Sequence, residues 1–109
     1  MDGVLIGPHD LSCSLGIPEQ YDHADFLRAV ETIFTKARDK NIGAGIHFWG
    51  SIEEQVAFLN MGANMLIHSG DIMLFAKHLR QDLNGIRSAA QIPPTPRVDG
   101  DTGRPDIEV

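Results

Sequence analysis

Short apolar runs alternate with helix-length amphipathic segments three times along this chain, and that alternation restricts its fold more than any other feature. The runs predict buried strands, because each is short, apolar and bordered by residues such as Gly, Pro or Asn. The predicted strands cover residues 3–6, 42–46 and 64–67. Since connections of helix length join them, the strands must run parallel with right-handed crossovers. The sequence therefore predicts an α/β fold of three strand–helix units.

Apolar residues at helical spacing predict three helices, over residues 23–40, 52–61 and 71–87. We expect Asp22 or Asp25 to cap the first helix. Ser51 and Glu54 have the spacing of a capping box at the start of the second helix. The cap of the third helix is predicted to be Asp71 or Ser69, which favours a structural role for Asp71 over a chemical one.

The second and third predicted helices each carry an apolar stripe. In the second, the predicted buried residues are Ile52, Val56 and Leu59. In the third, the apolar pattern is formed by Ile72, Phe75, Ala76, Leu79, Leu83 and Ile86. A stripe as strong as the third indicates either packing in the core or contact with another subunit. The glycines in the strand at 42–46 indicate that something packs very close to its backbone.

Polar segments that contain histidine follow all three predicted strands. His9 and Asp10 follow the first strand, His47 the second and His68 the third. Parallel strands place these segments at one edge of the sheet, where α/β folds bind their ligands. The sequence therefore predicts a site at this edge, with Asp10 as its first candidate.

Several interpretations of these residues remain open at this point. Asp10 can instead form a helix cap or an Asx turn after the proline. The three histidines fit a zinc site, a pocket lining or loop residues that form hydrogen bonds. Phe48 and Trp49 fit either helix–sheet packing or a pocket wall. Residues 11–18 are predicted to form a loop that can include one short helical turn. Cys13 within it has no orienting base at a suitable spacing, which disfavours a nucleophilic role.

Composition excludes several classes of protein. A net charge of −6 argues against nucleic acid or an anionic membrane surface as a partner. The single cysteine excludes an internal disulfide and fits a reducing compartment. No apolar run is long enough to span a membrane. We therefore expect a cytoplasmic location. Residues 90–109, rich in Pro and Gly, predict a disordered tail after a folded domain at 1–89.

A family resemblance is carried mainly by residues 2–16, which read DGVLIGPHDLSCSLG. This segment resembles DGVFIGPADLSASLG of the HpcH/HpaI family, the metal-dependent class II aldolases of 4-hydroxy-2-oxo acids. Weaker similarity follows in the same order, through the first helix, the glycine-containing strand and the stretch NMGANMLIHSGD, up to about residue 87. The Gly-Pro-x-Asp-Leu-Ser motif is the most specific part of this resemblance.

The resemblance implies both a fold and a reaction. The fold would be a TIM-type (β/α)8 barrel. Residues 1–89 would form its last three βα units, so that the chain starts abruptly at the first of these three strands. The family's final helix is often exchanged between subunits, which implies a homo-oligomer. The reaction would cleave a small-molecule 2-oxo acid to pyruvate and an aldehyde through a metal-stabilised enolate.

The resemblance also assigns roles to two residues. Asp10 would bind a divalent metal, Mg²⁺, Mn²⁺ or Co²⁺, together with a glutamate from an earlier strand. His9 stands where the family has a small residue that lies against the substrate carboxylate, and is therefore the candidate substrate-binding residue. The family's glutamate ligand, catalytic arginine and acid–base histidine match nothing in this sequence. The alternative is therefore a catalytically incomplete fragment that acts as a structural or oligomerisation module.

Overall fold

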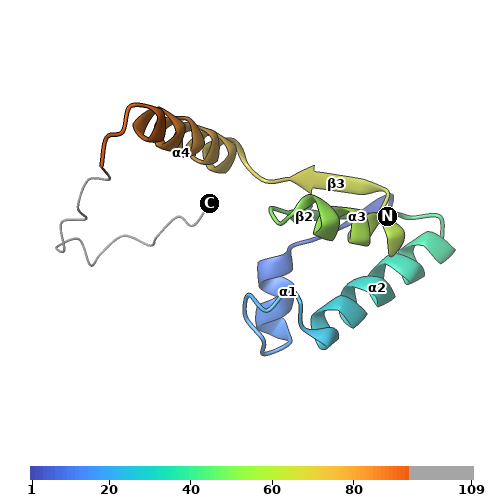
Figure 1. Ribbon diagram of the computed structural model, residues 1–109. Helices are drawn as coiled ribbons and strands as arrows, with labels where there is room; N and C mark the ends of the chain where they lie inside the picture. Colours follow the sequence, from blue (N-terminus) through green and yellow to red (C-terminus); the bar gives the residue numbers. More distant parts are fainter. Residues whose placement is uncertain (94–109) are drawn as a thin grey trace. The chain divides into compact units, whose positions relative to one another are not determined.

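The computed structural model describes residues 1–93, and Figure 1 shows their helices and strands. Its elements are β1 (Gly3–Ile6), α1 (Pro8–Ser14), α2 (Ala24–Asp39), β2 (Gly43–Phe48), α3 (Ile52–Asn60), β3 (Met65–His68) and α4 (Asp71–Ala89). The chain divides into two compact units, Met1–Ser69 and a second that begins at Gly70 and whose described helix is α4. Of the predicted tail at 90–109, residues 94–109 lie outside the described residues.

The three strands form one parallel sheet in the order β1-β2-β3, which confirms the predicted α/β fold. Leu5 pairs with Gly45, and Ile46 pairs with Leu66 on the other side of β2. Because side chains alternate along a strand, these pairings assign every strand residue to one of two faces. The sheet therefore has a face that carries Ile46 and a face that carries Leu5.

The face that carries Ile46 packs against helices α2 and α3 and forms the core of the first unit. Phe26, Val30 and Phe34 of α2 are fully buried against it. The core residues are Ile6, Phe26, Val30, Phe34, Ala37, Ala44, Ile46, Phe48, Phe58 and Ala63. The predicted spacing of α2 is confirmed, since the buried side chains recur at intervals of three and four residues along it.

The opposite face of the sheet is uncovered in the first unit. Leu5, Met65 and Ile67 share this face by register and are 41–48% exposed. A Cβ atom on Gly45 would lie 2.7 Å from the carbonyl oxygen of Met65, so only glycine fits there. The close packing that the glycines of this strand predict is thus confirmed at Gly45.

The short helical turn that the loop at 11–18 can include is present, but it belongs to a longer helix, α1, whose start at Pro8 was not predicted. Pro8 occupies the first turn of α1, a position at which its missing N–H costs no hydrogen bond. The helix ends in a Schellman motif: Gly16 has φ +74°, and the amide of Ile17 donates to the carbonyl of Ser12 at 2.9 Å. Pro8 therefore ends β1 and starts a helix at the same point.

The predicted buried stripe of α3 is also wrong. The capping box of Ser51 and Glu54 is present, as predicted. However, Ile52 is 76% exposed, while Gln55 and Phe58 are the buried residues of this helix. The side of α3 that faces the sheet is thus offset from its most apolar side. The stripe of α4 is likewise exposed along its length, since no residue of that helix is buried.

Two helices have caps other than those predicted. The N-cap of α2 is His23, whose Nδ1 accepts a hydrogen bond from the amide of Asp25 at 3.1 Å. The N-cap of α4 is Gly70, which has no side chain to cap with, and the Asp71 carboxylate accepts instead from the amide of Ile72 at 2.7 Å. None of the described helices is both long and apolar enough to cross a membrane.

Candidate functional site

Asp10 lies in the first turn of α1, directly beyond the carboxyl end of β1. Its side chain is exposed, and its Oδ2 would lie 3.1 Å from a Cβ atom placed on Gly7. The carboxylate therefore folds back over the turn that joins β1 to α1. It does not cap the helix, because the N-cap is Gly7 and no side chain bonds the helix start. The structure thus places Asp10 at the predicted edge and leaves its carboxylate accessible.

The side chain of Ser12 holds the backbone around Asp10 in place through hydrogen bonds. It is fully buried, and its hydroxyl donates to the carbonyl of His9 at 2.8 Å. The same hydroxyl accepts a hydrogen bond from the amide of Glu19 at 3.0 Å. Glu19 itself has φ +60°, a conformation that non-glycine residues adopt only where the surroundings hold them. These two hydrogen bonds join α1 to the turn that follows it and so hold the backbone on which Asp10 stands.

His9 is exposed and has neighbours on both sides of its ring. Its Nε2 lies 3.7 Å from the Sγ of Cys13, and its Nδ1 lies 3.6 Å from Oε1 of Glu19. The expectation that Cys13 has no base at a suitable spacing is therefore wrong, because a helix brings residues four apart together. All three side chains are solvent-exposed, so these contacts orient the imidazole only weakly.

The three histidines do not meet. His47 donates from Nε2 to the carbonyl of Ser69 at 2.6 Å, while His68 accepts at Nδ1 from the side-chain Nε2 of Gln55 at 2.7 Å. Within residues 1–93, no group of three or more His, Cys, Asp or Glu side chains is placed to hold a metal ion. Of the alternatives for these histidines, the structure therefore favours separate hydrogen-bonded positions over a shared zinc site.

Aromatic side chains gather near the end of β2. Phe48 is buried in the core, as the packing interpretation predicts, while Trp49 stacks on it and stays 40% exposed. Tyr21 contacts both rings edge-on, at centroid distances of 5.5 and 6.0 Å. Partial burial raises the pKa of Tyr21, and the nearby charges of Glu19 and Cys13 raise it further. Sequence reasoning missed Tyr21, because it lies in a loop outside any periodic pattern.

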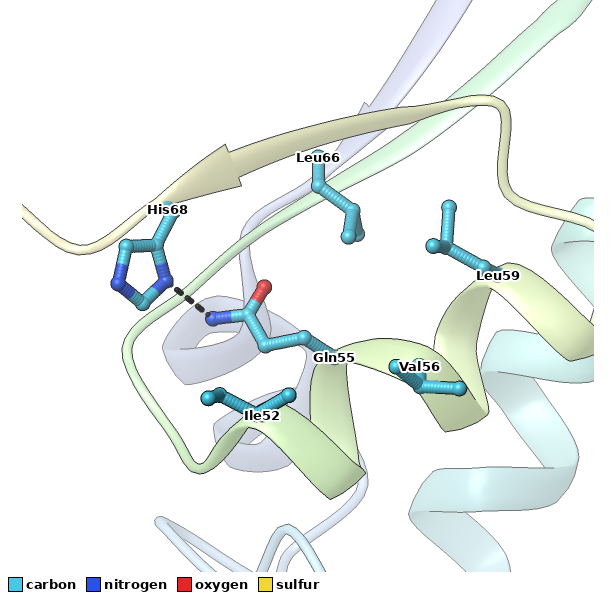
Figure 2. Close-up of a pocket in the computed structure, with 6 residues that line it drawn as sticks. All are labelled: Ile52, Gln55, Val56, Leu59, Leu66 and His68. Carbon is cyan, nitrogen blue, oxygen red and sulfur yellow. Dashed lines mark hydrogen bonds between the residues drawn. The ribbon is translucent and has the colours of Figure 1, made fainter.

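An apolar groove runs between α3 and β3 on the first unit, with a volume of about 280 Å³. Figure 2 shows its lining, which consists of Ile52, Gln55, Val56, Leu59, Leu66 and His68. Gln55 is its one buried polar residue: its Nε2 donates to the carbonyl of Phe48 at 2.9 Å as well as to His68. Its Oε1 is buried without a partner among the described residues. The sequence identifies Ile52, Val56 and Leu59 as the apolar side of α3 but predicts that this side is buried.

Asp10 is the only predicted metal ligand, and it supplies one hard oxygen donor of the type that Mg²⁺ and Mn²⁺ prefer. Mg²⁺ takes six ligands in octahedral geometry, of which one or two are usually protein carboxylates and several are waters. The donor chemistry of Asp10 therefore fits a divalent ion, but residues 1–93 supply only part of a ligand set.

The comparisons with known proteins agree on one family. The family model HpcH/HpaI aldolase/citrate lyase matches residues 1–77. The 2-keto-3-deoxy-L-rhamnonate aldolase of Shigella dysenteriae serotype 1 (strain Sd197) is 36% identical over 100 residues, which is 92% of this chain and 36% of that protein. The protein of the same name from Escherichia coli O9:H4 (strain HS) is 35% identical over the same shares.

A solved structure gives the same result for the fold. The crystal structure of the HpcH/HpaI aldolase from Desulfitobacterium hafniense DCB-2 matches with a TM-score of 0.75 and 26% sequence identity, over 86% of this chain and 36% of that one. The chain thus spans 36% of the length of the relatives it matches. The resemblance carried by the Gly-Pro-x-Asp-Leu-Ser motif is confirmed, and the chain belongs to the HpcH/HpaI aldolase/citrate lyase family.

Proposed function

We propose that this chain forms the last three βα units of a TIM-type (β/α)8 barrel that acts as a class II aldolase. The uncovered face of the sheet supports this proposal, because barrel closure would turn Leu5, Met65 and Ile67 into the packed interior. The two open edges, at β1 and β3, would then pair with strands from the remainder of the barrel.

The observation that carries the catalytic part of the proposal is the position of Asp10. It stands on the first turn after a parallel strand, on a backbone held by Ser12, with its carboxylate exposed. In (β/α)8 enzymes the residues at this edge perform the chemistry. We assign to Asp10 the binding of Mg²⁺, Mn²⁺ or Co²⁺, and such an ion would act as a Lewis acid toward the 2-oxo group of the substrate.

His9 is assigned to substrate binding through its position beside Asp10. The first hydrogen bond within α1 runs from the amide of Leu11 to the carbonyl of Gly7, so the helix does not use the amides of His9 and Asp10. Two such amides at a helix start suit a carboxylate. The substrate would therefore present its carboxylate to the backbone at His9.

The reaction assigned to the complete barrel is cleavage of a 4-hydroxy-2-oxo acid. The C3–C4 bond breaks, the hydroxyl at C4 loses its proton, and the bonding electrons remain on C3 as an enolate. Protonation of C3 then yields pyruvate, and C4 becomes the carbonyl carbon of an aldehyde. For 2-keto-3-deoxy-L-rhamnonate, the compound for which the relatives are named, the aldehyde is 2-hydroxypropanal. The proton acceptor, the second metal ligand and an arginine would come from the rest of the barrel.

The test combines the full 109-residue chain with the part of the Shigella relative that precedes the matched region, by co-expression. With Mn²⁺ present, the purified complex is expected to release pyruvate from 2-keto-3-deoxy-L-rhamnonate. It is also expected to exchange the methyl protons of pyruvate for deuterium, a reaction that needs no aldehyde. A complex that forms but supports neither reaction would refute the aldolase proposal.

A second candidate is a catalytically incomplete chain that acts as a structural or oligomerisation module. It is favoured by α4, whose apolar residues Ile72, Phe75, Leu79, Leu83 and Ile86 are all more than 40% exposed. An exposed apolar stripe of this size is expected to pack against another apolar surface. The groove between α3 and β3 of a second copy is such a surface. In both candidates the chain is expected to form a homo-oligomer, with no role for nucleic acid or a membrane.

Leu79→Asp is expected to dissociate that oligomer, because it places a charge in the middle of the apolar stripe of α4. The molar mass, measured by light scattering after gel filtration, should fall to that of the monomer. Asn84→Asp adds the same charge outside the stripe and should leave the mass of the oligomer unchanged. A variant Leu79→Asp that assembles like the unsubstituted chain would contradict the role assigned to α4.

A further inference from the structure

The uncovered face of the sheet carries a polar residue near its carboxyl end, His47. It pairs with Ile67 of β3, and it stands two residues after Gly45 on β2, so it lies on the same face as both. Sequence reasoning left its role open. In the barrel proposed above, this face is the interior, and its carboxyl end borders the substrate. His47 is thus a polar side chain at the mouth of an otherwise apolar wall.

The hydrogen bond of His47 defines which of its ring nitrogens carries the hydrogen. Its Nε2 lies 2.6 Å from the carbonyl oxygen of Ser69. A carbonyl only accepts, so Nε2 carries the hydrogen, and in the neutral ring Nδ1 is then the acceptor. The Trp49 ring stands nearly perpendicular to the imidazole at a centroid distance of 6.0 Å. The ring is therefore held from two sides, with Nδ1 as its remaining polar atom.

Ser69 is itself held in an unusual conformation. It has φ +56°, in the left-handed region that residues other than glycine avoid, and it is buried. Its amide donates to the carbonyl of Phe48 at 2.9 Å, while its carbonyl accepts from His47. Both bonds join the end of β2 to the turn after β3. A strained backbone that is maintained to orient one side chain is a feature typical of binding sites.

His47 also stands close to the edge where Asp10 lies. Ile6 pairs with Ile46, so the next residues along the two parallel strands, Gly7 and His47, are neighbours. The Asp10 carboxylate folds over Gly7. His47 thus lies near the end of β2, and Asp10 lies on the first turn after the adjacent strand, β1. Adjacent strands of a sheet are about 4.8 Å apart. In an extended substrate, three carbon–carbon bonds separate C2 from C5 and span roughly 4 Å.

We infer that His47 is a substrate-binding residue whose Nδ1 accepts a hydrogen bond from the hydroxyl on C5 of the substrate. This hydroxyl becomes the 2-hydroxyl of the aldehyde product. The inference rests on the proposed aldolase function, since it needs the oxo acid end of the substrate to bind at Asp10. It makes the enzyme selective for 2-hydroxyaldehydes over aldehydes without that hydroxyl.

The test measures the addition of pyruvate to two aldehydes, 2-hydroxypropanal and propanal, by the co-expressed complex with Mn²⁺. His47→Leu removes the acceptor and is expected to lower the ratio of the two kcat/KM values about tenfold, the effect of one hydrogen bond. His47→Gln keeps an acceptor and a donor and should restore much of that ratio. His78→Leu makes the same change at an exposed histidine of α4 and should leave the ratio unaltered.

The outcomes separate the inference from the function on which it rests. Deuterium exchange into pyruvate by the unsubstituted complex tests the aldolase proposal alone, and its absence would overturn both. If exchange occurs but His47→Leu slows both aldehydes equally, His47 has only a structural role and the inference is overturned. A measurement on the chain by itself adds a check: the ¹⁵N chemical shifts of His47 should report hydrogen on Nε2, and hydrogen on Nδ1 would overturn the inference.

Discussion

Asp10→Ala is expected to lower Mn²⁺-dependent deuterium exchange into pyruvate by at least about a hundredfold in the co-expressed complex. Lewis acid stabilisation by a bound metal contributes several kcal/mol, and each 1.4 kcal/mol is a factor of ten in rate. The exposed position of Asp10 predicts that the fold survives the change, because the side chain makes no contact in the core. The far-ultraviolet circular dichroism of the variant should therefore match that of the unsubstituted complex.

Two further variants make this result specific. Asp10→Asn keeps the shape of the side chain and removes its charge, so it should lose metal binding as well. Asp71→Ala removes an exposed carboxylate from the first turn of α4, the counterpart of Asp10 on another helix, and should leave exchange within about twofold of the original. The affinity for Mn²⁺, measured by calorimetry, should fall in the two Asp10 variants and stay unchanged in Asp71→Ala. Unchanged exchange in Asp10→Ala would remove the metal role from this residue.

The parts of the fold that the sequence predicts are those with local causes. The helix predicted at 23–40 is α2, at Ala24–Asp39, because its apolar spacing and its basic last turn both lie within the segment. The capping box at Ser51 and the glycine at 45 are likewise decided by neighbours in the chain or in the adjacent strand. The parallel direction of the strands follows from the length of their connections alone.

The sequence predicts at most one turn of α1, because the signals of this helix are ambiguous. Pro8 both ends a strand and suits the first turn of a helix, and the serines that follow favour turns in most contexts. The decisive features were Gly16, which provides the left-handed C-terminal end, and the buried hydroxyl of Ser12, which bonds two backbone groups. With α1 read as a loop, the contact of His9 with Cys13 was hidden as well.

The apolar stripes of α3 and α4 show a different limit of the sequence. Periodicity reports which side of a helix is apolar, and does not say what covers it. On α3 the sheet takes Phe58 and Gln55, while Ile52 stays exposed. The candidate site shows the same limit: the strand ends predict its edge, but the separate partners of His47 and His68 depend on tertiary contacts.

Phe34→Ala is expected to remove most of the stability of the first unit of the isolated chain. Phe34 is fully buried between α2 and the sheet, and truncating a buried phenylalanine costs about 3–5 kcal/mol. A unit of this size, Met1–Ser69, is expected to have a total stability of only about 3–10 kcal/mol. Its uncovered face and two open edges place it toward the lower end of that range. One truncation therefore removes most of the stability of the unit.

Phe75→Ala is the matched control, because it makes the same truncation at a residue of α4 that is 69% exposed. Urea unfolding, followed by circular dichroism at a concentration where the chain is monomeric, should show a lower midpoint for Phe34→Ala only. At higher concentration Phe75→Ala should weaken assembly while the first unit stays folded, since Phe75 belongs to the stripe proposed to contact a second copy. Equal loss of stability from both changes in the monomer would mean that α4 packs on the core of the first unit, and its stripe would then have no need of a partner.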